Sequence, residues 1–125
     1  FGENCHILPP TMQGSSVLHL KSAVTAMNHD TIVVPEGAAG DSLIASIEKA
    51  QIDQELSIVR VPDVLACNMV ACNNHVFFQD VSCVETRSVL EDAAQDRSLE
   101  SHWVDTSELA KKDAALTCCS ILLDI

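Results

Sequence analysis

Apolar residues recur along this chain in short runs, some with the period of a strand and some with that of a helix. In the first run, residues 17–27, Leu18 and Leu20 fall on one side and His19 and Lys21 on the other, which predicts a strand. The elements predicted after it are a turn at 28–30, a strand over 31–34, a helix that begins near 41 and a strand over 56–61.

The second half of the chain repeats this order. The predicted elements are a strand over 67–72, a hairpin turn at 73–74, a strand over 75–78, a helix that ends near 96, a strand over 102–104, a helical turn over 107–111 and a closing strand over 115–123. Strand, strand, helix, strand at a spacing of about fifty residues predicts two ββαβ units, and therefore an α/β fold. No linker interrupts the pattern, so we expect residues 1–125 to form a single domain.

Two such units do not close a ring. They leave open sheet edges and apolar faces, which other proteins cover with further structure. We therefore expect a protein partner, or further modules on the N-terminal side, within a complex of several subunits.

The amino-acid composition disfavours several classes of function. The hydrophobic content of 47% is that of a globular protein, and with 3% aromatic residues the core must be built from Val, Leu, Ile and Ala. The formal net charge of -11 disfavours nucleic acid and anionic membranes and favours a cationic small molecule or a basic protein. No apolar run approaches the length of a bilayer span.

Six cysteines invite a disulfide interpretation, but the chain is longer and more apolar than small disulfide scaffolds. We expect free thiols in a reducing compartment, the cytoplasm or the mitochondrial matrix. The chain has no CxxC motif, and the spacing from Cys67 to Cys72 does not suit a zinc finger, so we expect no metal or cofactor. Residue 1 is Phe, so we expect a processed product or part of a longer one.

Two short sequence segments contain the candidate catalytic residues. His19 lies in the string at 17–22, and Cys118 lies in the string at 116–120. A cysteine nucleophile needs a positioned imidazole, and the two residues need not be close in sequence.

These strings, with two others, resemble the dimethylarginine dimethylaminohydrolase family. The segments are 18–22, 61–63 followed by 66–68, 107–109, and 116–120 with Leu122. The resemblance implies the pentein fold, a ring of five ββαβ modules, of which this chain is similar to the last two. It also implies that Cys118 is the nucleophile and His19 the general acid and base, in a hydrolase that converts methylated arginine to citrulline and an amine.

Some features depart from the family. The carboxylates that bind the guanidinium and the arginines that hold the substrate carboxylate lie upstream of the His segment, so substrate binding would need a partner segment and its residues remain unknown. The segment 62–65 has an apolar residue where the family commonly has a second Asp, and Lys112 stands where the family has Val. A lysine there would repel a cationic substrate. The alternative function is a catalytically silent accessory subunit of a larger assembly, for example a mitochondrial one.

The remaining polar residues have plainer interpretations. A strand at 115–123 would place Cys118 and Cys119 on opposite faces, with Cys119 the more buried. We interpret Trp103 as an interface or core anchor. His29, His75 and His102 are interpreted as surface residues, and Glu91, Asp92, Asp96 and Glu100 as a solvated helix face.

Overall fold

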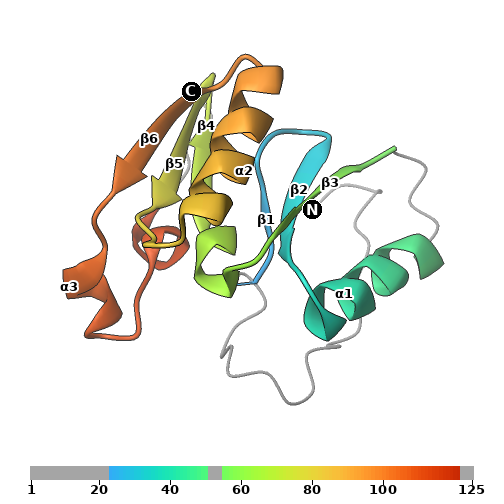
Figure 1. Ribbon diagram of the computed structural model, residues 1–125, viewed down its shortest axis with the longest axis horizontal. Helices are drawn as coiled ribbons and strands as arrows, with labels where there is room; N and C mark the ends of the chain where they lie inside the picture. Colours follow the sequence, from blue (N-terminus) through green and yellow to red (C-terminus); the bar gives the residue numbers. More distant parts are fainter. Residues whose placement is uncertain (1–22, 51–54, 122–125) are drawn as a thin grey trace.

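The computed structural model describes residues 23–50 and 55–121 (Figure 1). The first three-stranded sheet has β2 (Thr31–Pro35) at its centre, antiparallel to β1 (Thr25–Ala26) and parallel to β3 (Ser57–Val61). The crossover from β2 to β3 contains α1 (Ala38–Lys49). A parallel connection needs such a crossover, which the 12-residue helix supplies.

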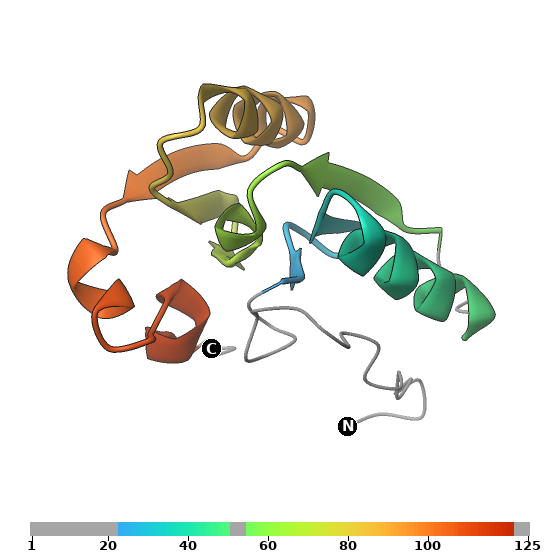
Figure 2. The same cartoon turned by 60° about the horizontal axis from the view of Figure 1, so that its bottom comes forward.

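The second sheet has the same topology. Its central strand β5 (His75–Gln79) is antiparallel to β4 (Met69–Cys72) and parallel to β6 (Glu100–Val104), and α2 (Val84–Asp96) makes the crossover. The prediction of two ββαβ modules is therefore confirmed. Figure 2 shows the modules side by side, and β1 contacts β4 where they meet.

Three short helical segments complete the described chain. The 3-10 helix η2 (Val64–Cys67) joins the modules, and α3 (Ser107–Ala110) and the 3-10 helix η3 (Leu116–Cys119) follow β6. None of the helices in the described ranges is long and apolar enough to cross a membrane.

The predicted strand at 115–123 is wrong where the structure describes it. Residues 116–119 form η3, in which the Cys118 amide donates to the Ala115 carbonyl at 3.0 Å. The Thr117 amide donates to the Asn68 side chain at 3.0 Å. These donors are satisfied locally and by a side chain, so the segment does not join a sheet.

One hydrophobic core serves both modules. Met27, Val33 and Val61 of the first module and Phe78 and Leu90 of the second are all fully buried in the same cluster. Helix α2 contacts both its own β6 and the β3 strand of the first module. Because this apolar surface is shared, neither module keeps its full core without the other.

Trp103 is partly buried and packs against the core, in keeping with one of its two expected roles. Its ring lies 4.9 Å from that of Phe78, its Nε1 donates to Glu91 at 2.8 Å, and the guanidinium of Arg87 lies 4.1 Å from the ring centre. The predicted acidic helix face needs one correction, because Glu100 belongs to strand β6.

Helix α1 begins directly against the end of β2. Gly37 caps the helix with a φ of 81°, a conformation that side chains disfavour. A Cβ on Gly40 would overlap the carbonyl oxygen of Pro35. The glycine at position 40 therefore allows the first turn of α1 to touch the β2 backbone.

Candidate active site

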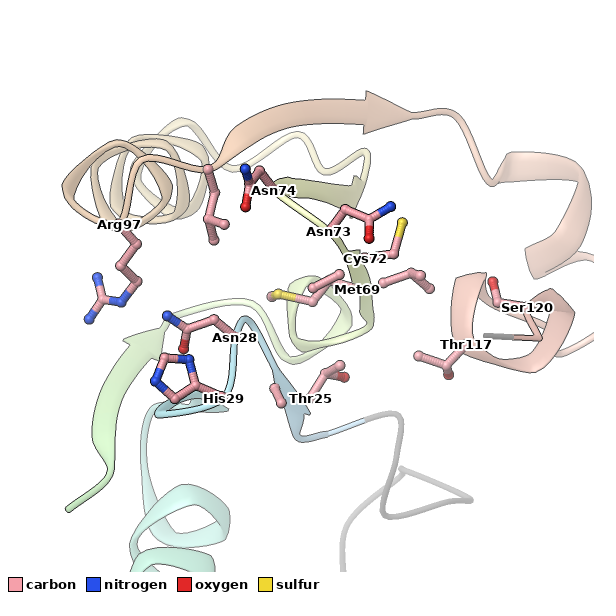
Figure 3. A pocket seen from close by; sticks show the side chains of 14 residues that line it. Thr25, Asn28, His29, Met69, Cys72, Asn73, Asn74, Arg97, Thr117 and Ser120 are labelled. Carbon is pink, nitrogen blue, oxygen red and sulfur yellow. The ribbon is translucent and has the colours of Figure 1, made fainter. Parts of the chain in front are cut away.

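A cavity of about 660 Å³ lies where the two modules meet (Figure 3). Strand β1 and the turn after it form one side, β4 and the 73–74 turn form another, and Arg97 and Leu99 after α2 contribute a third. Thr117 of η3 and Ser120, which follows η3, complete the lining. The described residues around it are Thr25, Ala26, Asn28, His29, Met69, Val70, Ala71, Cys72, Asn73, Asn74, Arg97, Leu99, Thr117 and Ser120.

The η3 segment is tied to this cavity by Asn68. The Asn68 side chain is buried at the end of η2, where it donates through Nδ2 to Thr117 Oγ1 at 2.9 Å and accepts from the Thr117 amide at 3.0 Å. Ser120 Oγ donates to the Leu116 carbonyl at 2.6 Å, which closes the segment on itself. Asn68 therefore sets where η3 lies relative to β4.

Cys118 lies in η3 between Thr117 and Ser120, the two residues through which the segment lines the cavity. Its own side chain is exposed, and it is not among the lining residues. Cys119 was expected to be the more buried of the pair, and the structure exposes both residues. Strand alternation does not apply to a 3-10 helix, whose residues rotate by about a third of a turn each.

Cys119 lines a different cavity. That space, about 430 Å³, lies between η3 and the sheet face that carries Val70, Phe77 and Val104. Cys118 is not among the residues that line this second cavity.

His19 lies outside the described residues, so its proximity to Cys118 stays a prediction. Among the lining residues that the structure describes there is no Asp or Glu. The cation at the cavity, Arg97, is held by three hydrogen bonds. Its Nε donates to Thr31 Oγ1 at 2.7 Å, Nη2 to Ser57 Oγ at 2.8 Å and Nη1 to the Ala93 carbonyl at 2.9 Å. The bonds to Thr31 and Ser57 join the end of α2 to the first module.

The described thiols differ in environment. Cys67 is fully buried, and burial, with a smaller effect from the Asp63 carboxylate, raises the pKa of its thiol to about 12. Such a thiol stays protonated at neutral pH and is a poor nucleophile. Cys72, Cys118 and Cys119 are exposed, and all five cysteines in the described ranges are free thiols.

Sequence reasoning missed one cluster of polar side chains. His75 and His102, interpreted separately as surface residues, lie with Nδ1 and Nε2 3.1 Å apart, and Glu100 lies beside both. The parallel register of β5 and β6 creates this contact, and that register is not visible in either string of residues.

Comparison with known proteins finds similarity at the level of structure. No protein-family profile matches the sequence, and no curated protein matches it. The dimethylarginine dimethylaminohydrolase of Pseudomonas aeruginosa, solved with citrulline, superposes with a TM-score of 0.56 at 22% identity over 80% of this chain and 34% of that one.

Two other solved structures are similar to this chain. Agmatine deiminase of C. jejuni has a TM-score of 0.61 at 12% identity over 80% of this chain and 37% of that one. A putative arginine deiminase of Porphyromonas gingivalis has a TM-score of 0.56 at 17% identity, with coverages of 80% and 36%. All three are pentein-superfamily proteins, so this chain shares their fold over about a third of their length.

Proposed function

We propose that this chain is the cysteine-bearing part of a guanidino-group hydrolase, and that its two ββαβ modules belong to a five-module ring. One observation carries the proposal. The two hydrogen bonds between Asn68 and Thr117 hold η3 at the cavity between the modules, so that Cys118 lies, in sequence, between two residues of the cavity wall.

The reaction assigned to the site needs a thiolate and an acid. The Cys118 sulfur adds to the guanidinium carbon, and the C–N bond to the departing amine breaks as His19 gives that amine a proton. His19 then takes a proton from water, whose oxygen attacks the same carbon. The C–S bond breaks, the thiolate is restored and a ureido product leaves.

Substrate binding requires carboxylates from elsewhere. A guanidinium cation is held by carboxylates in the bidentate geometry that it favours, and no Asp or Glu lines the described part of the cavity. Lys112, exposed after α3, adds a positive charge to this end of the chain. A further module or a partner chain would therefore supply the anionic half of the site.

The substrate class follows from two kinds of support. The structurally similar proteins are described as acting on agmatine or arginine, or as binding citrulline, all of them guanidino compounds or their ureido products. The four sequence segments resemble the dimethylarginine dimethylaminohydrolase family in particular. We therefore place methylated arginine first among the candidate substrates.

The test uses the full chain, tagged and purified under native conditions with the chains that accompany it. Dimethylarginine, arginine and agmatine are supplied in turn, and the ureido product is measured. We expect turnover that Cys118→Ala abolishes and the matched Cys119→Ala variant retains, because only one of the two thiols attacks. Turnover that survives Cys118→Ala would contradict the proposal.

A second candidate function is a catalytically silent accessory subunit of a larger assembly, in a reducing compartment such as the cytoplasm or the mitochondrial matrix. The absence of carboxylates in the described cavity lining favours it. In that case the natively purified assembly forms no ureido product from any of the three substrates, while the chain still co-purifies with its partners in fixed stoichiometry.

A further inference from the structure

Three potential metal ligands meet on one face of the second sheet. In the parallel pair of β5 and β6, His75 lies opposite Glu100 and Phe77 lies opposite His102. Side chains two residues apart on a strand share a face, so His75, Glu100 and His102 all project to the same side. The alternate residues Val76 and Phe78 are buried in the core, which leaves these three on the outer face.

The distances among the three side chains match those around a small metal ion. His75 Nδ1 lies 3.1 Å from His102 Nε2 and 3.5 Å from Glu100 Oε2, and His102 Nε2 lies 3.6 Å from Glu100 Oε1. Two ligand atoms about 2.1 Å from a tetrahedral zinc ion lie about 3.4 Å from each other. The two imidazole nitrogens and the Glu100 carboxylate therefore lie about as far apart as the ligands on one face of such a tetrahedron, with Oε2 facing His75 and Oε1 facing His102.

The ligands are also held in place. The His102 ring stacks on Phe77 at 4.9 Å between centroids and 20° between planes, which limits its rotation. The Glu100 amide donates to the Asn74 carbonyl at 2.8 Å, which ties the start of β6 to the 73–74 turn. Rigid strands that carry partly exposed ligands bind an ion with little reorganisation and leave a path for its entry.

The chemistry of these three side chains indicates which metal ion they would bind. Two imidazoles with one carboxylate suit zinc and its neighbours among the divalent transition metals, and they suit calcium or magnesium poorly. The net charge of -11 attracts cations to the chain as a whole. We propose that His75, Glu100 and His102 bind one divalent transition-metal ion, with Zn²⁺ as the preferred ion and water at the fourth position.

This metal site does not depend on the proposed hydrolase function, so metal binding can be tested independently of the activity of Cys118. The full chain, freed of metal with a chelator, is titrated with Zn²⁺ by calorimetry, and its thermal midpoint is followed with and without the ion. We expect one equivalent to bind at this site and to raise the midpoint, because an ion that binds only the native state stabilises it.

The matched variants separate this site from other ligands of the chain. His75→Ala and His102→Ala should each weaken the binding of this equivalent by more than about tenfold, since even the loss of an outer-shell partner costs about 10–100-fold. Glu100→Gln should weaken it too. His29→Ala removes an imidazole elsewhere, on a side chain that is 85% exposed, and should leave the affinity unchanged.

Two further readouts keep the test decisive. Circular dichroism without metal checks that each variant is folded, and the metal-dependent midpoint shift is compared only among folded variants. Co²⁺ bound by imidazole and carboxylate gives visible bands without the intense near-ultraviolet bands of thiolate ligation. Binding that survives both histidine substitutions, or that shows thiolate bands and disappears when the cysteines are alkylated, would overturn the proposal.

Discussion

Asn68 and Thr117 are joined by two hydrogen bonds across 49 residues of sequence. The amide side chain uses its donor and its acceptor on the same residue, so it fixes both the position and the orientation of η3. Asn68 ends the 3-10 helix η2, which joins the two modules. Its contact with Thr117 therefore sets the position of η3, the segment that contains Cys118.

Asn68→Ala should release η3. The substitution removes both bonds and leaves the Thr117 amide without its partner, so we expect a loss of about 1–3 kcal/mol in the free energy of unfolding. Hydrogen exchange at the Thr117 amide should accelerate as well. Asn74→Ala, in the exposed hairpin turn, is the matched control and should change neither quantity. Unchanged exchange in Asn68→Ala would contradict the anchoring role.

Gly40→Ala should destabilise the protein although alanine is the better helix former. Helix propensity alone favours the substitution by about 1 kcal/mol, whereas the added methyl would overlap the Pro35 carbonyl oxygen. Overpacking of this kind costs about 1–3 kcal/mol and should outweigh the gain. Chemical denaturation measures the balance. Ala45→Gly, on the exposed side of α1, reports the propensity effect by itself, and a stabilised Gly40→Ala would refute the close approach.

Arg97 should be needed for the contact between the modules. Its guanidinium bonds to Thr31, Ser57 and the Ala93 carbonyl at once, so Arg97→Lys cannot replace it with a single ammonium group. We expect both Arg97→Lys and Arg97→Ala to lower the free energy of unfolding by about 1–2 kcal/mol.

The control for this prediction is Arg60→Ala. Arg60 pairs with Asp41 at 2.7 Å on the surface, where an ion pair contributes less than about 1 kcal/mol. Equal losses in the Arg60 and Arg97 variants would show that the contact between the modules does not depend on Arg97.

Cys67 should make the fold sensitive to alkaline pH. Burial raises its pKa from the ordinary 9.0 to about 12 in the folded chain, so between these values the folded state holds a proton that the unfolded state has lost. The stabilisation is complete below about pH 9 and is lost as the pH rises toward 12. From about pH 8 to pH 10 this loss amounts to about 1 kcal/mol.

Denaturation at the two pH values tests this effect. Cys67→Ala should be less stable at about pH 8, because a buried side chain is shortened, but should lose less stability between the two values than the parent chain. Cys72→Ala, which removes an exposed thiol, should keep the parent dependence. A parallel decline in the parent and in Cys67→Ala would contradict the assignment.

Local pattern was sufficient for most of the elements. The alternation and the apolar run at 31–34 predicted β2, helical spacing predicted α1 and α2, and the Asn73–Asn74 pair predicted the hairpin between β4 and β5. These elements depend on neighbours within a few residues, so the sequence by itself determined the two ββαβ modules. Trp103, expected to be an interface or core anchor, packs against the core while partly buried.

Only the tertiary structure decided the rest, because it depends on residues that meet from distant parts of the chain. The apolar residues of 115–121 are compatible with a strand, but the bonds from Asn68 and the local amide contacts make the segment a 3-10 helix and expose both of its cysteines. The parallel register of β5 and β6 brings His75, 27 residues away in sequence, against His102. Short-range periodicity determines which face a side chain takes, and long-range register determines which other side chains it meets there.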